Sequence, residues 1–373
     1  MSEILSTTTA IRSAHRFDVS RLETWLCARI HGFRGPPEVA QFSGGQSNPT
    51  YLLTTPAAKY VLRRKPPGTL LPSAHAIDRE YRLLTALRGT GVPVADPYCY
   101  CDDASVIGSE FYVMSYVNGR VLWDARLPGM TPDERRAVFD EMNRVMAALH
   151  TLDIDALGLR DYGRTGSYFE RQVSRWTKQY CASQTHRIES VERLIAWLPE
   201  HMPTRETTAL VHGDFSLHNM MFAPDEPRII AVLDWELSTL GDPFADFAYL
   251  CLAWHMPSDG GRGLGGLSAA EIASLGIPQE SAFVSEYCRR TGVEKVDARE
   301  WNFYLAYNFF RGAAILQGIT KRALDGNASN EHALEFGQRA AVLADLGWTC
   351  AERAMNVKTS RLIAACTHKE QHK

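Results

Sequence analysis

Two carboxylates and one amide in the middle of the chain are the side chains best suited to chemistry. Asp214 ends the run His212-Gly213-Asp214, Asn219 stands five residues further on, and Asp234 comes fifteen residues after Asn219. Transfer of a phosphoryl group from a nucleotide needs a carboxylate that accepts the proton of the attacking hydroxyl, and oxygen ligands that hold Mg²⁺ against the phosphates. Aspartate and asparagine are also common loop formers, so the prediction rests on their combination and spacing.

Two short apolar runs precede these residues and predict the strands that position them. The runs are Ala209-Leu210-Val211 and Ile229-Ile230-Ala231-Val232-Leu233, and each stops within a few positions of an acidic residue. A loop after a buried strand can present its side chains where a ligand binds. We therefore expect both carboxylates at one cleft.

The segment from His212 to Asn219, HGDFSLHN, resembles the catalytic loop of the aminoglycoside phosphotransferase family and is similar to the H-R-D-x-x-x-x-N loop of protein kinases. Leu233-Asp234-Trp235-Glu236 resembles the metal-binding segment of that family, which stands where protein kinases carry D-F-G. The resemblance implies that Asp214 is the catalytic base, and that Asn219 and Asp234 are ligands of Mg²⁺ beside bound ATP. It extends over about residues 35–350.

The fold implied by this resemblance is α+β, a protein-kinase-like bilobal fold with a β-rich N-terminal lobe and a mainly helical C-terminal lobe. Local patterns agree, because residues 50–54, 60–63 and 111–117 are β-branched or aromatic runs and residues 76–88 have helical periodicity. We expect a nucleotide-binding lobe at 1–117, of which 1–35 is a helical or irregular lead-in. The helical lobe at 118–373 would then carry the catalytic loop and the acceptor site.

A glycine-rich turn precedes the first strand of the predicted nucleotide-binding lobe. In Gly44-Gly45-Gln46-Ser47-Asn48 the glycines let the backbone approach phosphates, and N–H groups supply donors. We expect Gly44, Gly45, Ser47 and Asn48 to form a flap over the nucleotide. Ordinary turn chemistry is the alternative for this segment taken alone.

Arg63 and Glu80 are predicted to form an ion pair. Residues 61 and 63 share one face of their strand, and Glu80 lies beside the apolar stripe of the following helix. A carboxylate there needs a cationic partner. Arg63 stands where most kinase-like enzymes have lysine, and a guanidinium binds phosphate as a fork rather than as a point charge. Lys59 and Lys65 are the alternatives for the phosphate contact.

The strand at 111–117 would supply the segment that meets the adenine. By the resemblance, the backbone of Met114, Tyr116 and Val117 forms the hinge that contacts the base. This completes a set of predicted nucleotide contacts that come from the first 117 residues.

The acceptor side is less clear from the sequence. Trp176 lies on an aromatic helical face, and Tyr307 and Arg311 share a face of a later helix. A cation on an apolar stripe is either paired structurally or directed at a bound anion, and the sequence leaves both open. Aminoglycosides are polycations, and the helical region shows no acidic cluster that would bind them.

The extended similarity includes Tyr51-Leu52-Leu53 and Val61-Leu62-Arg63-Arg64-Lys65-Pro66-Pro67. It resembles the kinase-like module that precedes an acyl-CoA dehydrogenase in some multidomain proteins. This implies a hydroxy acid or a hydroxyacyl-CoA as the small-molecule acceptor. The alternatives are an aminoglycoside-type antibiotic kinase and a pseudokinase-type nucleotide-binding module without turnover.

Composition excludes several other classes of protein. Among the 373 residues, 40 Lys+Arg balance 43 Asp+Glu, which disfavours a nucleic-acid partner. No apolar run approaches the roughly 18 residues of a membrane span, and residues 1–17 lack the apolar core of a signal peptide. Eight dispersed cysteines indicate reduced thiols. We expect a cytoplasmic protein without a membrane partner, and the sequence leaves the oligomeric state open.

Overall fold

The computed structural model describes residues 8–43, 48–66, 76–258, 263–326 and 333–370. The chain forms two compact units. The first comprises residues 1–123, 137–162 and 212–238, and the second comprises 124–136, 163–211 and 239–373. The first unit therefore holds the whole predicted nucleotide-binding lobe together with the predicted catalytic loop and metal-binding segment. The division at residue 117 into a nucleotide-binding lobe and a helical lobe stays a prediction.

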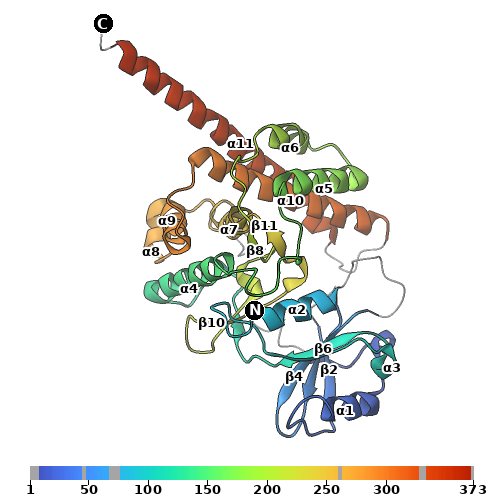
Figure 1. Ribbon diagram of the computed structural model, residues 1–373. Coiled ribbons are helices and arrows are strands. Elements are labelled where there is room, and N and C mark those ends of the chain that lie inside the picture. The colour runs from blue at the N-terminus through green and yellow to red at the C-terminus, as the bar shows by residue number, and fades with distance from the viewer. Residues whose placement is uncertain (1–7, 44–47, 67–75, 259–262, 327–332, 371–373) are drawn as a thin grey trace. The chain divides into compact units, whose positions relative to one another are not determined.

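A six-stranded antiparallel sheet forms the centre of the first unit (Figure 1). Its spatial order is β1 (Thr8–Thr9), β2 (Glu38–Phe42), β3 (Thr50–Thr54), β4 (Lys59–Arg64), β6 (Phe111–Ser115) and β5 (Pro97–Cys101). A short turn joins β3 to β4, and the antiparallel pairing of the two strands places Thr50 opposite Arg63 and Thr54 opposite Lys59. The runs at 50–54 and 60–63, predicted as strands, thus form a hairpin in which Thr50 lies opposite Arg63.

Helices cover both faces of this sheet, as Figure 1 shows for α1 (Val19–Cys27) and α2 (Ile77–Leu87). Alternation along β4 decides which side chain meets which helix. Tyr60 and Leu62 pack into an apolar cluster with Leu22 and Leu26 of α1, so Arg63 points to the opposite face, where α2 lies. The short α3 (Ala104–Ile107) also contacts α1.

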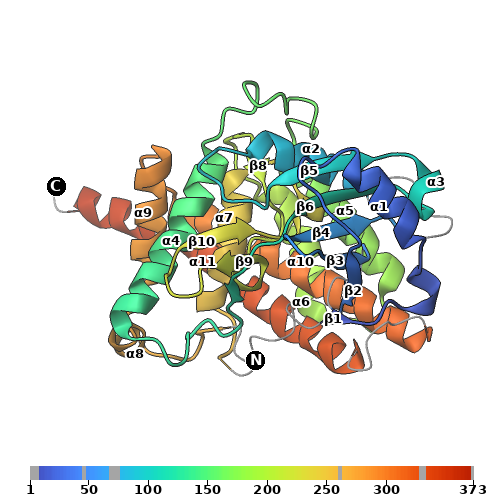
Figure 2. The ribbon, with the colours of Figure 1, turned by 90° about the horizontal axis from the view of Figure 1, so that it is seen from below.

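A second, three-stranded sheet in the first unit carries the loops predicted to be functional. Its order is β10 (Ile229–Val232), β9 (Met220–Phe222) and β7 (Arg120–Val121). The single helical turns η2 (Leu217–Asn219) and η3 (Trp235–Leu237) adjoin its strands. Figure 2 shows α4 (Pro132–His150) beside β10, where the Glu141 carboxylate accepts a hydrogen bond from the Ile229 amide at 3.1 Å.

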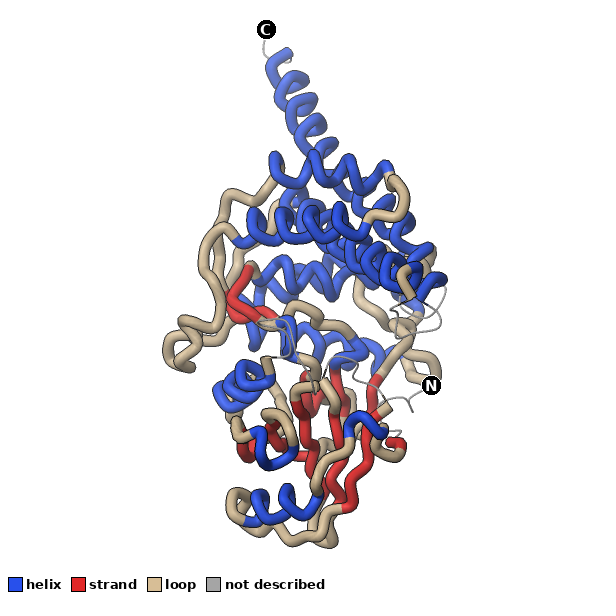
Figure 3. Tube along the Cα trace, turned by 90° about the vertical axis from the view of Figure 1, so that its right-hand side faces the viewer, coloured by secondary structure: helices blue, strands red, loops and turns tan. Residues whose placement is uncertain are grey.

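The second unit is mainly helical (Figure 3). Its longest helices, α10 (Ala298–Leu324) and α11 (Ala333–Glu370), pack against each other and against the helix at Glu189–Glu200. The other elements of the chain are η1 (Ser13–His15), α5 (Tyr168–Ser183), α6 (Glu189–Glu200), β8 (Ala209–Val211), β11 (Thr239–Gly241), α7 (Pro243–Cys251), η4 (Leu252–Trp254), α8 (Ala269–Ser274) and α9 (Glu280–Thr291). The predicted α+β class, with a β-sheet N-terminal region and a helical C-terminal part, is confirmed. In the part of the chain that the structure describes, no helix is both long enough and apolar enough to span a bilayer.

Asp242 is the N-cap residue of α7, and its side chain is buried. Its carboxylate accepts hydrogen bonds from the amides of Phe244 at 2.8 Å and Ala245 at 3.2 Å, as an N-cap followed by proline predicts. Burial raises the pKa of Asp242 to about 7, although these two amides act to lower it. In the unfolded chain the pKa would be close to the ordinary value of 3.8.

This difference makes the stability of the protein depend on pH. Between about pH 4 and pH 7 the folded chain retains a proton on Asp242 that the unfolded chain has lost, so stability falls as the pH rises through this window. Asp242→Asn keeps a capping oxygen and removes this titration. Urea unfolding at pH 5 and pH 8 should show the wild type losing stability relative to the variant, and parallel losses would contradict the assignment.

Candidate active site

The predicted catalytic loop is held by a buried histidine. His212 is fully buried, its Nδ1 accepts a hydrogen bond from the Asp214 amide at 3.2 Å, and its Nε2 lies 2.8 Å from the Leu233 carbonyl oxygen. Because Nδ1 is the acceptor, the ring proton must sit on Nε2, which donates to Leu233. One imidazole thus joins the loop that carries Asp214 to the residue directly before Asp234.

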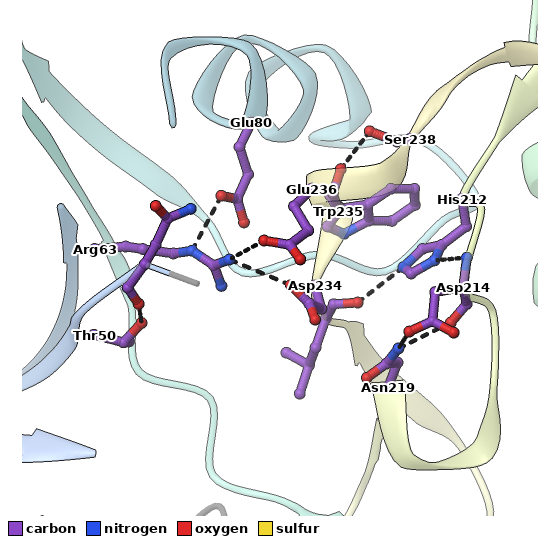
Figure 4. A network of polar contacts seen from close by, with 12 residues as sticks. Thr50, Arg63, Glu80, His212, Asp214, Asn219, Asp234, Trp235, Glu236 and Ser238 are labelled. Atoms are coloured by element: carbon purple, nitrogen blue, oxygen red, sulfur yellow. Dashed lines mark hydrogen bonds and ion pairs between the residues drawn. The ribbon is translucent and has the colours of Figure 1, made fainter. Parts of the chain in front are cut away.

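Asp214 and Asn219 form a hydrogen-bonded pair within the loop. The Nδ2 group of Asn219 donates to the Asp214 backbone oxygen and to its carboxylate Oδ2, both at 2.9 Å. The backbone carbonyl oxygen of Asn219 in turn accepts a hydrogen bond from the Leu233 amide at 2.8 Å. These contacts fix the carboxylate relative to the strand that leads to Asp234 (Figure 4).

Asp234 adopts a backbone conformation that is rare for a residue with a side chain. Its φ and ψ are 62° and 61°, in the left-handed region. Neighbouring contacts hold this bend, because the Trp235 indole donates to the Val232 carbonyl at 2.9 Å and the Ser238 hydroxyl donates to the Trp235 carbonyl at 2.5 Å. Such strain costs on the order of 1–3 kcal/mol and is concentrated at functional sites. Here it turns the carboxylate out of the strand, with 42% of the side chain exposed.

The predicted ion pair between Arg63 and Glu80 is present. Arg63 Nε lies 3.1 Å from Glu80 Oε2, and the two side chains are only 12% and 5% exposed. Arg63 Nη2 also donates to Asp234 Oδ1 at 3.3 Å and lies 3.9 Å from Glu236 Oε2. Burial acts to lower the pKa of Arg63, but Glu80 and then Tyr112, Asp234 and Glu236 raise it, and the net change is upward. The guanidinium is therefore permanently charged.

The two lysines that could have replaced Arg63 have other partners. Lys65 Nζ is 2.7 Å from Glu110 Oε2. Lys59 lies at the other end of β4, with its ammonium 5.4 Å from the centre of the Tyr116 ring. Arg63 is thus the cation that pairs with Glu80. Its contact with nucleotide phosphates stays a prediction.

Of the predicted phosphate flap, Gly44, Gly45 and Ser47 lie outside the described residues. Asn48 is buried, and its backbone oxygen accepts a hydrogen bond from the Thr50 hydroxyl at 3.1 Å. Thr50 is paired with Arg63 across the β3–β4 ladder. The chain that leaves the flap therefore passes directly beside Arg63.

The predicted adenine-binding segment forms the end of β6 and the residues that follow. Met114 pairs with Val61 of β4, and Tyr116 and Val117 come directly after the strand, all three partly exposed. Their role towards a base stays a prediction. Met114 is paired within the sheet with Val61 and Pro97, whereas Tyr116 and Val117 belong to no helix or strand.

The predicted acceptor residues form one cluster in the second unit. The Arg311 guanidinium carbon lies 5.6 Å from the centre of the Trp176 ring and 5.2 Å from that of Tyr249. Tyr307 packs edge-on against Phe169 with ring centres 5.3 Å apart. Arg311 is only 8% exposed. The structure thus brings Trp176, Tyr307 and Arg311 together, and their role in binding an acceptor stays a prediction.

The chemistry of the donors near Asp214 fits a hard divalent cation. Asn219 and Asp234 offer oxygen ligands, which Mg²⁺ prefers, and Mg²⁺ is usually held by one or two protein groups together with phosphates and water. Within the described ranges, no group of three His, Cys, Asp or Glu side chains could hold a metal by itself.

Comparison with known proteins agrees with this geometry. A model of the phosphotransferase enzyme family (APH) matches residues 38–283. The chain belongs to this family. A solved phosphotransferase structure from Ralstonia eutropha JMP134, provisionally named an aminoglycoside phosphotransferase, is 52% identical, has a TM-score of 0.84, and covers 91% of this chain and 99% of its own. The aminoglycoside phosphotransferase APH(4)-Ia is 15% identical with a TM-score of 0.55, covering 89% and 99%. The kinase-like fold is thereby confirmed.

The curated relatives are longer proteins. Mouse acyl-CoA dehydrogenase family member 10 is 48% identical over 86% of this phosphotransferase chain and 30% of its own length. Human acyl-CoA dehydrogenase family member 11 is 41% identical over 92% and 44%. The chain thus spans less than half the length of these curated relatives. The predicted resemblance to a kinase-like module found with acyl-CoA dehydrogenases is confirmed.

Sequence reasoning left three neighbours of this phosphotransferase site without a role in chemistry. His212 was part of the motif, but its bridging bonds depend on the position of Leu233. Tyr112 pairs with Arg63 across the β4–β6 ladder, and its buried hydroxyl lies near Glu80. Strand alternation along β6 was the signal that could have found it. Glu236 was named only as the end of the segment Leu233-Asp234-Trp235-Glu236, and the structure places its carboxylate 3.9 Å from Arg63 Nη2.

Gly213 is required by the geometry of this loop. Its φ is +84°, and a Cβ there would lie 2.7 Å from the Leu237 backbone oxygen. Gly213→Ala should therefore destabilise the protein by more than the cost of about 1 kcal/mol for positive φ alone. Gly32→Ala is the matched control, because Gly32 has φ +79° and nothing within 4 Å of its Cβ position. Equal losses of unfolding free energy in urea would contradict the close approach.

Proposed function

We propose that this protein is an ATP- and Mg²⁺-dependent kinase that moves the γ-phosphate to a hydroxyl of a small molecule. The observation that carries the proposal is the hydrogen-bonded pair of Asp214 and Asn219, joined through His212 and Leu233 to Asp234. A proton acceptor and two oxygen ligands held by one rigid network are what phosphoryl transfer requires of a protein. The family and the fold, which are those of small-molecule phosphotransferases, support it.

In this proposal Asp214 accepts the proton of the attacking hydroxyl and holds its oxygen in line with the γ-phosphate. Asn219 orients the carboxylate through its amide hydrogen atoms. Asn219 and Asp234 would hold Mg²⁺, which supplies neutralisation of the charge on the phosphates. Arg63, kept in place by Glu80, binds the phosphates from the sheet side.

The remaining nucleotide contacts come from the first unit. Gly44, Gly45, Ser47 and Asn48 would cover the phosphates, and the backbone of Met114, Tyr116 and Val117 would bind the adenine. ATP is favoured because a mutant of APH(4)-Ia, which shares the fold, has been solved in a ternary complex with AMP-PNP and hygromycin B.

The acceptor proposed is a hydroxy acid or a hydroxyacyl-CoA. Its support is the similarity to proteins named as acyl-CoA dehydrogenase family members, together with the cationic cluster of Trp176, Tyr307 and Arg311. An anionic acceptor is attracted by a guanidinium, whereas a polycationic aminoglycoside is repelled by it. No nucleic acid or membrane takes part in this reaction.

Asp214→Asn tests the chemistry. The amide keeps the shape and the hydrogen bond but cannot accept the proton, so kcat should fall by roughly 10²–10⁴, the usual range for a lost general base. Nucleotide affinity should stay within a few-fold because Asp214 does not ligate the metal. The assay measures ADP release with short- and medium-chain hydroxy acids and their CoA thioesters, and with an aminoglycoside panel for the alternative acceptor.

Three results separate the alternatives. Equal turnover by wild type and Asp214→Asn on a good acceptor removes Asp214 as the base. Tight binding of Mg·ATP without turnover of any acceptor favours the pseudokinase alternative. Turnover of aminoglycosides alone replaces the acceptor class and leaves the kinase activity standing.

Asp234→Asn tests the metal. The substitution replaces a charged ligand by a neutral one, so the affinity for ATP in the presence of Mg²⁺ should fall about tenfold or more, as even indirect metal contacts contribute 10–100-fold. The affinity for ATP in EDTA should not fall. Calorimetric titration under both conditions gives the comparison, and equal affinities of wild type and variant in Mg²⁺ would remove Asp234 as a ligand.

A further inference from the structure

One guanidinium group, that of Arg63, forms ion pairs with three carboxylates in the first unit. Arg63 Nε faces Glu80 Oε2 at 3.1 Å, while its Nη2 faces Asp234 Oδ1 at 3.3 Å and Glu236 Oε2 at 3.9 Å (Figure 4). The three carboxylates come from α2 and from the segment after β10. Arg63 is therefore already bound to the residue that is proposed to ligate the metal.

The contacts of Arg63 differ in how easily they can be exchanged. Glu80 is 5% exposed and lies on the buried side of a helix, so its contact with Arg63 is fixed by packing. Asp234 and Glu236 are 42% and 32% exposed and can be reached from solvent. A second cation can replace Arg63 at these two carboxylates without breaking the buried pair.

We propose that Arg63 competes with the divalent cation for Asp234, and that nucleotide phosphates relieve this competition by drawing the guanidinium towards themselves. The inference rests on the proposed function, in which Asp234 is a metal ligand. The metal by itself must approach a carboxylate that already faces a fixed positive charge, and the two cations repel each other. Phosphate oxygens placed between them attract both, so that metal and nucleotide each favour the binding of the other.

The competition depends on arginine at this position rather than lysine. The fork of the guanidinium lets Nε contact Glu80 while Nη2 contacts Asp234. An ammonium group has one nitrogen on a flexible stem and cannot lie close to both carboxylates at once in this way. Arg63→Lys therefore keeps the charge and the pair with buried Glu80, and leaves Asp234 more accessible to a metal ion.

The test measures binding of Mn²⁺ alone, by electron paramagnetic resonance, without nucleotide or turnover. Arg63→Lys should bind Mn²⁺ about fivefold or more tightly than wild type, which is the lower end of typical coupling between two sites. The control is Arg82→Lys, the same substitution on α2, where Arg82 forms an exposed ion pair with Asp161. It should bind Mn²⁺ as wild type does.

A second variant covers a failure of Arg63→Lys to fold. Arg63→Met combined with Glu80→Met removes the buried pair as a unit, which is often tolerated when apolar residues of similar volume replace it. It should also bind Mn²⁺ more tightly than wild type. Unchanged or weaker binding of Mn²⁺ in the folded variants overturns the competition.

Asp234→Asn separates this inference from the proposed function. If adding Asp234→Asn removes the gain in Mn²⁺ affinity, the metal binds at the site described and the competition holds. If Mn²⁺ binding depends on Asp234 but not on residue 63, the proposed function stands and this inference fails. If Mn²⁺ binding does not depend on Asp234 in any background, the metal assignment of the proposed function fails as well.

Discussion

A positive charge that is largely shielded from water is the constraint on which the arrangement of this site depends. Arg63 is 12% exposed, and a charge so placed is costly unless carboxylates surround it. Glu80 meets this need from α2, and breaking such a pair usually costs about 3–5 kcal/mol because it leaves one charge unpaired. The pair therefore ties α2 to β4. The same guanidinium reaches Asp234, so that the proposed metal ligand and the sheet share one electrostatic centre.

The predicted catalytic loop is positioned by hydrogen bonds rather than by ion pairs. His212 connects the Asp214 amide to the Leu233 carbonyl, and Asn219 holds the Asp214 carboxylate. Because His212 is fully buried, its bonds do not compete with water. Asp234 then leaves the strand in a left-handed conformation that these contacts stabilise. Such preorganisation is what a phosphotransferase needs, since it contributes position and electrostatics rather than covalent chemistry.

The ion pairs of Arg63 and the hydrogen bonds of the predicted catalytic loop both lie in the first unit. Residues proposed for nucleotide, metal and proton transfer come from segments that are far apart in sequence but packed in one unit. The cluster of Trp176, Tyr307 and Arg311 is formed within the second unit by α5 and α10. The proposed function therefore assigns the acceptor contacts and the phosphoryl-transfer residues to different units, and a family can vary such a site on an unchanged scaffold.

Much of this site could be predicted from the sequence because it follows from local rules. The alternation of β4 directed Arg63 towards α2, the stripe of that helix placed Glu80 opposite, and the spacing of Asp214, Asn219 and Asp234 indicated one catalytic loop and one metal segment. Asp242 and Pro243 likewise predicted the start of α7, which the structure confirms.

Tertiary structure alone decided which of these side chains form ion pairs or hydrogen bonds with one another. The ion pair of Lys65 could not be predicted, because its partner Glu110 lies 45 residues away along the chain. The role of Glu236 required the bend at Asp234, since a left-handed residue reverses the direction of the chain that follows. Sequence patterns report the face on which a side chain lies, with periods of 2 and 3.6 residues. They do not report distances between segments separated by 171 residues, such as Arg63 and Asp234, because only packing brings those together.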